Sequence, residues 1–132
     1  MAKSYMKNYE LWLKHALSNL EIARVGQFTE NVLYSDLCFE CQQAAEKSLK
    51  ALLIFHDIDF PKTHSIQKLL DLLSNFYNID LDLQRTILLS QHSANSRYPN
   101  EEIFEIDEND YKEALELAEF IFSWVNEKLR IT

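Results

Sequence analysis

The stretch from Ser35 to Asp57 constrains the fold of this chain most, because it is long, periodic and free of proline and glycine. At about 100° per residue, its side chains separate into two arcs of a helix. The apolar arc contains Leu37, Cys38, Cys41, Ala44, Ala45, Ser48, Leu49 and Leu52. The polar arc contains Asp36, Glu40, Gln43, Glu46, Lys47 and Lys50. Propensity and periodicity together predict a core helix with one solvated edge.

Two residues of this helix depart from the pattern. Gln42 projects into the apolar arc, where a side-chain amide needs hydrogen-bond partners. It is either a buried glutamine bonded to a neighbouring helix or across a dimer contact, or a polar group at the edge of a site. Phe39 is an aromatic residue on the polar side. Together they indicate that this face meets another surface.

Composition narrows both the fold class and the function. A length of 132 residues predicts one domain over 1–132, and one glycine and two prolines with 47% hydrophobic residues favour helices. A phosphate-binding loop or a dinucleotide fingerprint needs several glycines in one loop, so both are excluded. The net charge of −8 opposes long-range attraction of nucleic acid or an anionic membrane. Any RNA contact must therefore be local.

The cysteines and the N-terminus bear on compartment and cofactors. Cys38 and Cys41 lie on the apolar arc, without the second pair or nearby histidine that would complete a zinc site. We therefore expect reduced core thiols, no metal and no other cofactor. The N-terminus lacks an apolar signal core, and no stretch approaches about 20 uninterrupted apolar residues. These features predict a cytoplasmic protein without a membrane span.

Four further helices are expected around the 35–57 helix. The first runs from a Ser4 cap to about Val25 and stops at Gly26, and the short turn that follows makes it antiparallel to 35–57. The others are expected at about Ile66–Phe76 with a Thr63 cap, Leu81–His92 with an Asp80 cap, and Asn109–Arg130 with Asp107 and Glu108 at its start. The segment 103–106 is too short to support a sheet. The predicted fold class is all-α, an antiparallel bundle of about five helices with a four-helix up-and-down core.

Four segments, in this order and spacing, carry a family resemblance. They are Trp12-Leu13 with His15-Ala16 and Asn19-Leu20, Gln42–Lys47 with Leu49–Leu53, Pro61–Ile66 leading into Leu69-Leu70, and Arg97-Tyr98-Pro99. Together they resemble the HEPN domain, a helical module of prokaryotic proteins often encoded beside a minimal nucleotidyltransferase. The resemblance covers essentially the whole chain. It implies a homodimer that binds a nucleotidyltransferase partner, a nucleotide or RNA.

HEPN ribonucleases carry an arginine followed by four to six residues and a histidine. Arg97 has no histidine at that distance, whereas Arg85 and His92 have six residues between them and would share one helix face. Asn19 stands where family members commonly have aspartate. In a metal-independent cleavage, His92 or His64 would take the 2′-hydroxyl proton, while Arg97 or Arg85 would hold the phosphate. Two subunits would contribute these groups to one cleft.

Each candidate also has a purely structural interpretation. His64 is suited to anchoring its loop or capping the next helix. Glu46 and Lys50, four residues apart, would form an ordinary ion pair on the solvated edge. Arg97, followed by Tyr98 and a proline, would either lock onto a carboxylate or stay exposed for an anion or a partner.

Three functions are consistent with these observations. The first is a dimeric module that binds a minimal nucleotidyltransferase, with contacts to the partner or a nucleotide from Gln42, Glu46, Lys50, His64, Arg97 and Tyr98. The second is a ribonuclease toxin of a toxin–antitoxin pair, with Arg97, His92 and Arg85 as catalytic residues. The third is a protein that binds a nucleotide without cleaving RNA. We favour the first, because an acidic surface and an exposed aromatic residue suit protein recognition better than RNA.

Overall fold

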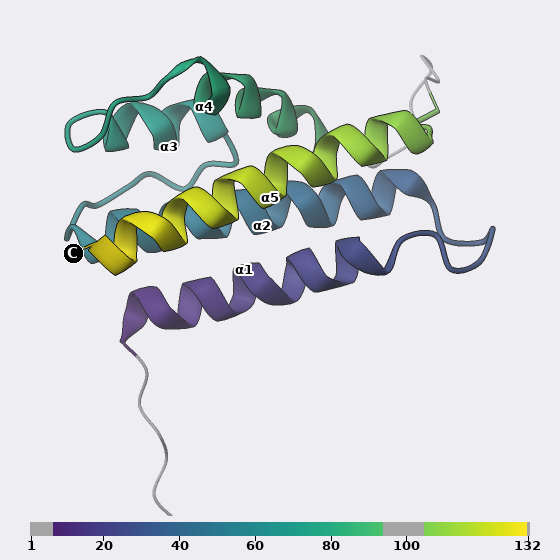
Figure 1. Ribbon diagram of the computed structural model, residues 1–132, viewed down its shortest axis with the longest axis horizontal. Helices are drawn as coiled ribbons and strands as arrows, with labels where there is room; N and C mark the ends of the chain where they lie inside the picture. Colours follow the sequence, from purple (N-terminus) through teal and green to yellow (C-terminus); the bar gives the residue numbers. More distant parts are fainter. Residues whose placement is uncertain (1–6, 94–104, 132) are drawn as a thin grey trace, which may run out of the picture.

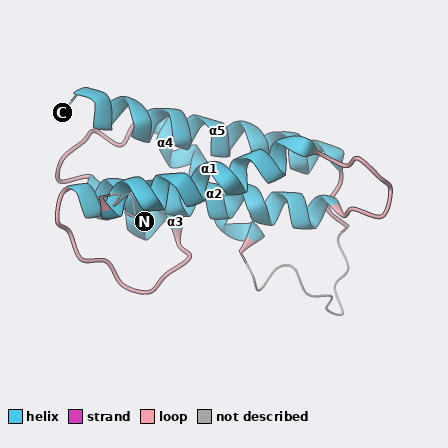
Figure 2. Ribbon diagram, turned by 90° about the horizontal axis from the view of Figure 1, so that it is seen from below, coloured by secondary structure: helices cyan, strands magenta, loops and turns pink. Residues whose placement is uncertain are grey.

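Five α-helices and one 3-10 helix make up the computed structural model, which describes residues 7–93 and 105–131. The elements are α1 (Asn8–Val25), α2 (Tyr34–Phe55), α3 (Ile66–Leu73), α4 (Leu81–Arg85), the 3-10 helix η1 (Thr86–His92) and α5 (Glu108–Ile131). Figure 2 shows helices and loops without a strand over these described ranges. The predicted all-α fold is therefore confirmed.

Helix α2 is the centre of the bundle. Long helices α1 and α5 run beside it, and α3 and α4 lie on the side of the bundle away from α1 (Figure 1). The largest fully buried apolar side chains come from all of these elements: Leu20, Leu49, Leu52, Leu53, Ile66, Leu69, Leu70, Leu73, Leu83, Leu89 and Ile121. Because α1 packs mainly on α2, it is an edge helix with one side turned outward. No helix among the described residues is long and apolar enough to cross a membrane.

The first two helices end at residues with positive φ. Gly26, the predicted stop of α1, has φ 75° and ψ −166°, a combination that glycine adopts easily because it has no Cβ. Asp57 has φ 56° and closes α2: its N–H donates to the Ile54 carbonyl, and the N–H of Ile58 donates to the Leu53 carbonyl, both at 3.0 Å. This is a Schellman motif with aspartate at the left-handed position. Both ends are set by local backbone chemistry.

Three predicted helix boundaries are wrong. Helix α1 starts at Asn8 after an extended Lys7, rather than at Ser4, which lies outside the described residues. The cap of α3 is Ser65, whose Oγ accepts from the Lys68 N–H at 3.2 Å, while Thr63 accepts from the N–H of Ser65 itself. Helix α3 also ends at Leu73, three residues earlier than predicted. Only at α3 did a neighbouring residue, Ser65, offer the same capping hydroxyl as the predicted Thr63; Lys7 makes no side-chain capping bond at the start of α1.

The expected helix over 81–92 changes type at its middle. Its Asp80 cap is confirmed, because Asp80 Oδ1 accepts from the Leu83 N–H at 2.9 Å, but the α-helical turns stop at Arg85. Beyond that point Thr86, Leu89 and His92 are buried at three-residue spacing. A 3-10 helix has three residues per turn, so this geometry puts all three on one inward face.

The acidic start of α5 and the burial of the two cysteines were both expected from the sequence. Asp107 Oδ1 accepts from the Asp110 N–H at 2.9 Å, and Asp110 Oδ2 accepts from the Asp107 N–H at 3.0 Å, a reciprocal cap. Cys38 and Cys41 are unpaired thiols with no exposed surface. Burial raises the pKa of the Cys38 thiol to about 12 and that of Cys41 further still. Both therefore stay protonated in the core.

Candidate functional site

Three polar side chains of α2 are buried together. Gln42, Glu46 and Lys50 are 0%, 4% and 8% exposed, so the prediction that Glu46 and Lys50 lie on a solvated edge is wrong. The reason is the loop between α2 and α3, which covers that flank of the helix. The Lys50 ammonium lies 5.5 Å from the ring centre of Phe60 in this loop and 5.8 Å from that of Trp12 on α1.

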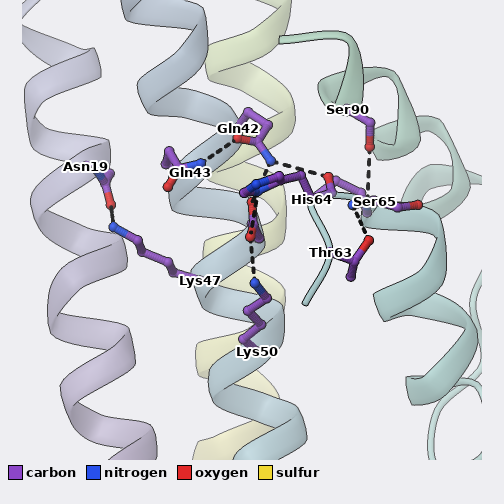
Figure 3. A network of polar contacts seen from close by, with 11 residues as sticks. Asn19, Gln42, Gln43, Lys47, Lys50, Thr63, His64, Ser65 and Ser90 are labelled. Carbon is purple, nitrogen blue, oxygen red and sulfur yellow. Dashed lines mark hydrogen bonds and ion pairs between the residues drawn. The ribbon is translucent and has the colours of Figure 1, made fainter. Parts of the chain in front are cut away.

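The Glu46 carboxylate is the centre of this network, whose other members Gln42, Lys50 and His64 are labelled in Figure 3. It accepts hydrogen bonds from Lys50 Nζ at 2.6 Å and from Gln42 Nε2 at 2.7 Å, and His64 Nδ1 lies 3.1 Å from Oε2. Burial alone would raise the pKa of Glu46, but the bonds from Lys50, Gln42 and His64 outweigh it and the pKa falls below its ordinary value. The carboxylate is therefore charged at neutral pH.

The network holds the loop more directly than it could hold a ligand. Gln42 Nε2 also contacts the His64 carbonyl at 3.4 Å, and Gln42 Oε1 accepts from Gln43 at 2.9 Å, so its partners lie on α2 and the loop. No buried side-chain nitrogen or oxygen among the described residues lacks a hydrogen-bond partner. Of the four residues expected to contact a partner or nucleotide here, only His64 is open to solvent, with 62% of its side chain exposed. Their role in binding stays a prediction.

A second polar chain joins α1 to the opposite flank of α2. Asn19 Nδ2 donates to Glu40 Oε2 at 2.7 Å, and Asn19 Oδ1 accepts from Lys47 Nζ at 2.8 Å. An amide does both because it carries a donor and an acceptor, whereas an ionised aspartate could not donate to Glu40. Sequence reasoning noted Asn19 only as a departure from the family pattern. Its bridging role depends on how α1 and α2 are aligned, which the sequence did not show.

The outward surface beside this chain contains two hollows. One, of about 260 Å³, is lined by Leu11, Trp12, His15 and Lys47. The other, also about 260 Å³, lies where α1 turns into α2 and is lined by Ile22, Val25, Gly26, Phe28, Val32, Asp36, Leu37 and Glu40. Phe28 is 72% exposed, Val25 63%, Leu33 58% and Ile22 48%. We call the surface formed by these two hollows and the Glu40–Asn19–Lys47 chain the α1–α2 face.

The described residues do not assemble the expected ribonuclease pair. Arg85 is exposed, lies 3.9 Å from Glu116, and lines a groove of about 470 Å³ together with Asp82, Glu119 and other α5 residues. His92 is 6% exposed, and its burial lowers its pKa, although Asp110 and Glu113 act in the opposite direction. The two do not share an exposed face, because α4 gives way to η1 between them.

The remaining candidate residues of the late loop stay a prediction from the sequence. Arg97 and Tyr98 lie outside the described residues. Within the described ranges 7–93 and 105–131, no group of three or more His, Cys, Asp or Glu side chains is placed to hold a metal ion.

Comparison with known proteins agrees with the fold and the motifs. The model of the HEPN domain matches residues 9–128. TT1696 from Thermus thermophilus, seen in a crystal structure, has 30% sequence identity to this chain and a TM-score of 0.82. The match covers 93% of this chain and 99% of that one. ST0689, an archaeal HEPN homologue also seen in a crystal structure, has 33% sequence identity to this chain and a TM-score of 0.72. The match covers 93% of this chain and 98% of that one. No curated protein matches. The chain therefore belongs to the HEPN domain family.

Proposed function

We propose that this protein is a dimeric interaction module that binds a minimal nucleotidyltransferase. The observation that carries the dimeric part of the proposal is the uncovered apolar surface around the end of α1, where Ile22, Val25, Phe28 and Leu33 are 48% to 72% exposed. Single exposed apolar residues are ordinary, but a cluster of them around a hollow is typical of a protein interaction site.

Charge supports protein recognition over nucleic-acid recognition. The chain carries a net charge of −8, and the groove between α4 and α5 is lined by the carboxylates of Asp82, Glu116 and Glu119. Phosphate backbones are held by arginine and lysine side chains, and among the described residues Arg85 is the only one that lines this groove. The groove is open and partly apolar, with Phe120 38% exposed, so it offers a surface for a second, different protein.

The test is co-purification with the nucleotidyltransferase. A tagged chain is co-expressed with the product of the neighbouring reading frame, and the complex is sized by light scattering. We expect both proteins in one stable complex, which Phe120→Glu disrupts and Lys112→Glu, an exposed α5 substitution outside the groove, does not. Recovery of the free chain, with the nucleotidyltransferase eluting separately, would contradict the proposal.

A ribonuclease role has less support from the described residues. Arg85 and His92 lie in different environments, which leaves Arg97 with a histidine from another part of the chain or from a second subunit. Cleavage by such a pair predicts that inducing the chain alone arrests growth and that Arg97→Ala or His92→Ala relieves the arrest. Normal growth with the wild-type chain would count against it.

Nucleotide binding, implied by the family resemblance, is tested by thermal denaturation. A nucleotide that binds the folded state raises the melting temperature in proportion to the logarithm of its concentration. We expect His64→Ala to abolish the shift with ATP if the His64 loop takes part, because this ring is the exposed member of the Glu46 network. An unchanged melting temperature at millimolar ATP would remove nucleotide from the proposal.

A further inference from the structure

The groove between α4 and α5 leaves apolar surface in contact with water. Its volume is about 470 Å³, and its wall on α5 includes Leu117 and Phe120, with Phe120 38% exposed. Arg85, at the end of α4, lines the other side. Leu88 follows Arg85 by three residues, one turn of the 3-10 helix η1, so the two project in the same direction, and Leu88 is 48% exposed. The groove therefore has an uncovered aromatic ring on one side and an uncovered leucine beside the other.

The outward side of α5 carries carboxylates before and after Phe120. Five exposed residues follow one another at steps of three and four, which places them on one side of the helix. They are Glu113, Glu116, Phe120, Ser123 and Glu127, and we call them the acidic stripe. Glu113 and Glu127 are each seven residues from Phe120, which is two helical turns or about 10 Å. The aromatic ring therefore has negative charge on both sides along the helix.

Nearby cations balance the carboxylates of the groove only in part. Glu119 accepts from Arg24 Nε at 2.7 Å and from its Nη2 at 3.2 Å, so its charge is already paired. Glu116 lies 3.9 Å from Arg85, but their side chains are 71% and 52% exposed, and water screens a pair at that distance. Asp82 adds a further carboxylate from α4. The groove therefore carries net negative charge beside its apolar surface.

We propose that this groove binds a basic amphipathic helix of a partner protein. The apolar side of that helix lies on Phe120 and Leu88, and its lysine and arginine side chains face the acidic stripe and Asp82. Charge complementarity selects this occupant, because a second copy of the chain has the same net charge of −8, and the chain's own segment 94–104 has two glutamates against one arginine. The inference deepens the proposed function and rests on it, because it gives the chemistry of the segment by which the partner binds.

The two kinds of contact have different effects on binding. An amphipathic helix laid in a groove buries its apolar side chains, and this burial supplies most of the affinity. Exposed ion pairs add less, but opposite charges select the basic partner and speed its association. Arg85 works against this partner, because it holds a positive charge inside the groove and next to Glu116. Removing that charge should therefore strengthen binding, which a purely apolar docking site would not show.

Synthetic peptides test the chemistry of the occupant. The probe is a fluorescein-labelled helical peptide of about 18 residues, long enough to span the acidic stripe, with leucine along one side and arginine on both flanks of that side. The control peptide has glutamate in place of every arginine. We expect the basic peptide to bind the full chain with a dissociation constant of roughly 10 to 100 µM by fluorescence anisotropy, and to bind more weakly as salt is added. We expect the acidic peptide not to bind.

Substitutions in the groove test where the peptide binds. Glu116→Lys is expected to weaken binding of the basic peptide about fivefold or more, because it puts a cation where the peptide has cations. Phe120→Ala removes the apolar anchor and is expected to weaken binding about tenfold. Arg85→Gln is expected to strengthen binding about twofold to fivefold. The double variant E113K/E116K is expected to bind the acidic peptide better than the wild-type chain does.

Controls separate binding from folding. Glu10→Lys is the same charge reversal at an exposed residue of α1, on the other side of the bundle from α4, and should leave the affinity for the peptide unchanged. Lys112→Gln removes a cation from α5 outside the acidic stripe, as Arg85→Gln does inside the groove, and should not strengthen binding. Circular dichroism melting checks that each variant is folded.

The results with the basic peptide and with the nucleotidyltransferase are separable. No binding of the basic peptide at about 1 mM, equal binding of the acidic peptide, or binding that Glu116→Lys and Phe120→Ala leave unchanged would overturn the inference. If the nucleotidyltransferase complex is lost with Phe120→Glu but keeps its full affinity with Glu116→Lys, the partner uses the groove without a basic segment; the inference then falls and the proposed function stands. If the basic peptide binds as expected while the nucleotidyltransferase elutes separately, the proposed function falls and the inference stands for another protein.

Discussion

Helix α2 carries two polar clusters that differ in what lies over them. Glu46 and Lys50 are sealed beneath the α2–α3 loop with Gln42, whereas Glu40 and Lys47 lie on the α1–α2 face with Asn19; Figure 3 shows members of both clusters on either side of α2. Both contain a carboxylate, an ammonium and an amide. The comparison teaches that residue type does not decide the role: the covered cluster fixes a loop, and the open one joins α1 to α2 near the surface.

The largest expected effect comes from breaking the covered cluster. Glu46→Gln keeps the size of the side chain but leaves the Lys50 ammonium buried without a counter-charge. Removing one partner of a buried pair costs about 3 kcal/mol or more, which we expect as a loss in the free energy of unfolding measured with urea. A loss below about 1 kcal/mol would mean that water reaches Lys50 and that the two clusters are less different than their exposure indicates.

The covered cluster should also make the free energy of unfolding depend on pH in the acid range. The pKa of Glu46 in the folded chain lies below its unfolded value of about 4.3, so the unfolded state binds more protons as the pH falls. The stabilisation is complete above that value and is lost as the pH drops through the folded pKa. Urea titrations between pH 7 and pH 3 should therefore show a smaller acid loss for Glu46→Gln than for the wild type. Parallel losses would contradict this.

A double substitution tests whether the Glu46–Lys50 pair stabilises the fold, or whether instability arises only when one of the two charges is left buried alone. Glu46→Leu together with Lys50→Met replaces both charges by apolar groups of similar length. We expect an unfolding free energy within about 1 kcal/mol of the wild type, because neither charge is left alone. The loop should nevertheless loosen, since His64 loses its carboxylate contact, and limited proteolysis within residues 56–65 is the measurement. A loop as resistant as in the wild type would show that Glu46 does not anchor it.

The smallest effect is expected in the open cluster. Glu40→Gln is the same substitution as Glu46→Gln, six residues away on the same helix. The glutamine carbonyl can still accept from Asn19, and partly exposed charges contribute little, so we expect a change below about 0.5 kcal/mol in urea. A loss as large as that of Glu46→Gln would remove the contrast between the clusters.

Most of the local chemistry was predictable from the sequence, although the helix starts predicted at Ser4 and Thr63 were wrong. The stop at Gly26, the cap at Asp80, the acidic residues at the start of α5 and the apolar arc of α2 depend on residues within one or two turns, and all are observed. The HEPN family was recognisable from motifs such as Gln42–Lys47 in their order. The expected exposure of Glu46 and Lys50 and the expected continuous helix over 81–92 depended on distant segments, and both were wrong.

Two failures show the physical reason. A helical wheel gives the direction of Glu46 and Lys50 but not the path of a loop that returns 18 residues later to cover them. The change from α4 to η1 follows from packing Thr86, Leu89 and His92 against other elements, which no local propensity specifies. Gln42, Glu46, Lys50 and His64, named from the sequence as candidate contacts, meet in one network, but their role in binding stays a prediction.

The buried thiols of Cys38 and Cys41 can serve as a built-in chemical probe of local unfolding. A sulfur that is protonated and shielded does not react with iodoacetamide, so alkylation occurs only in molecules whose α2 has separated from its neighbours. Mass spectrometry of alkylated chains would therefore count rare openings without any added label. It would also report whether assembly makes such openings rarer.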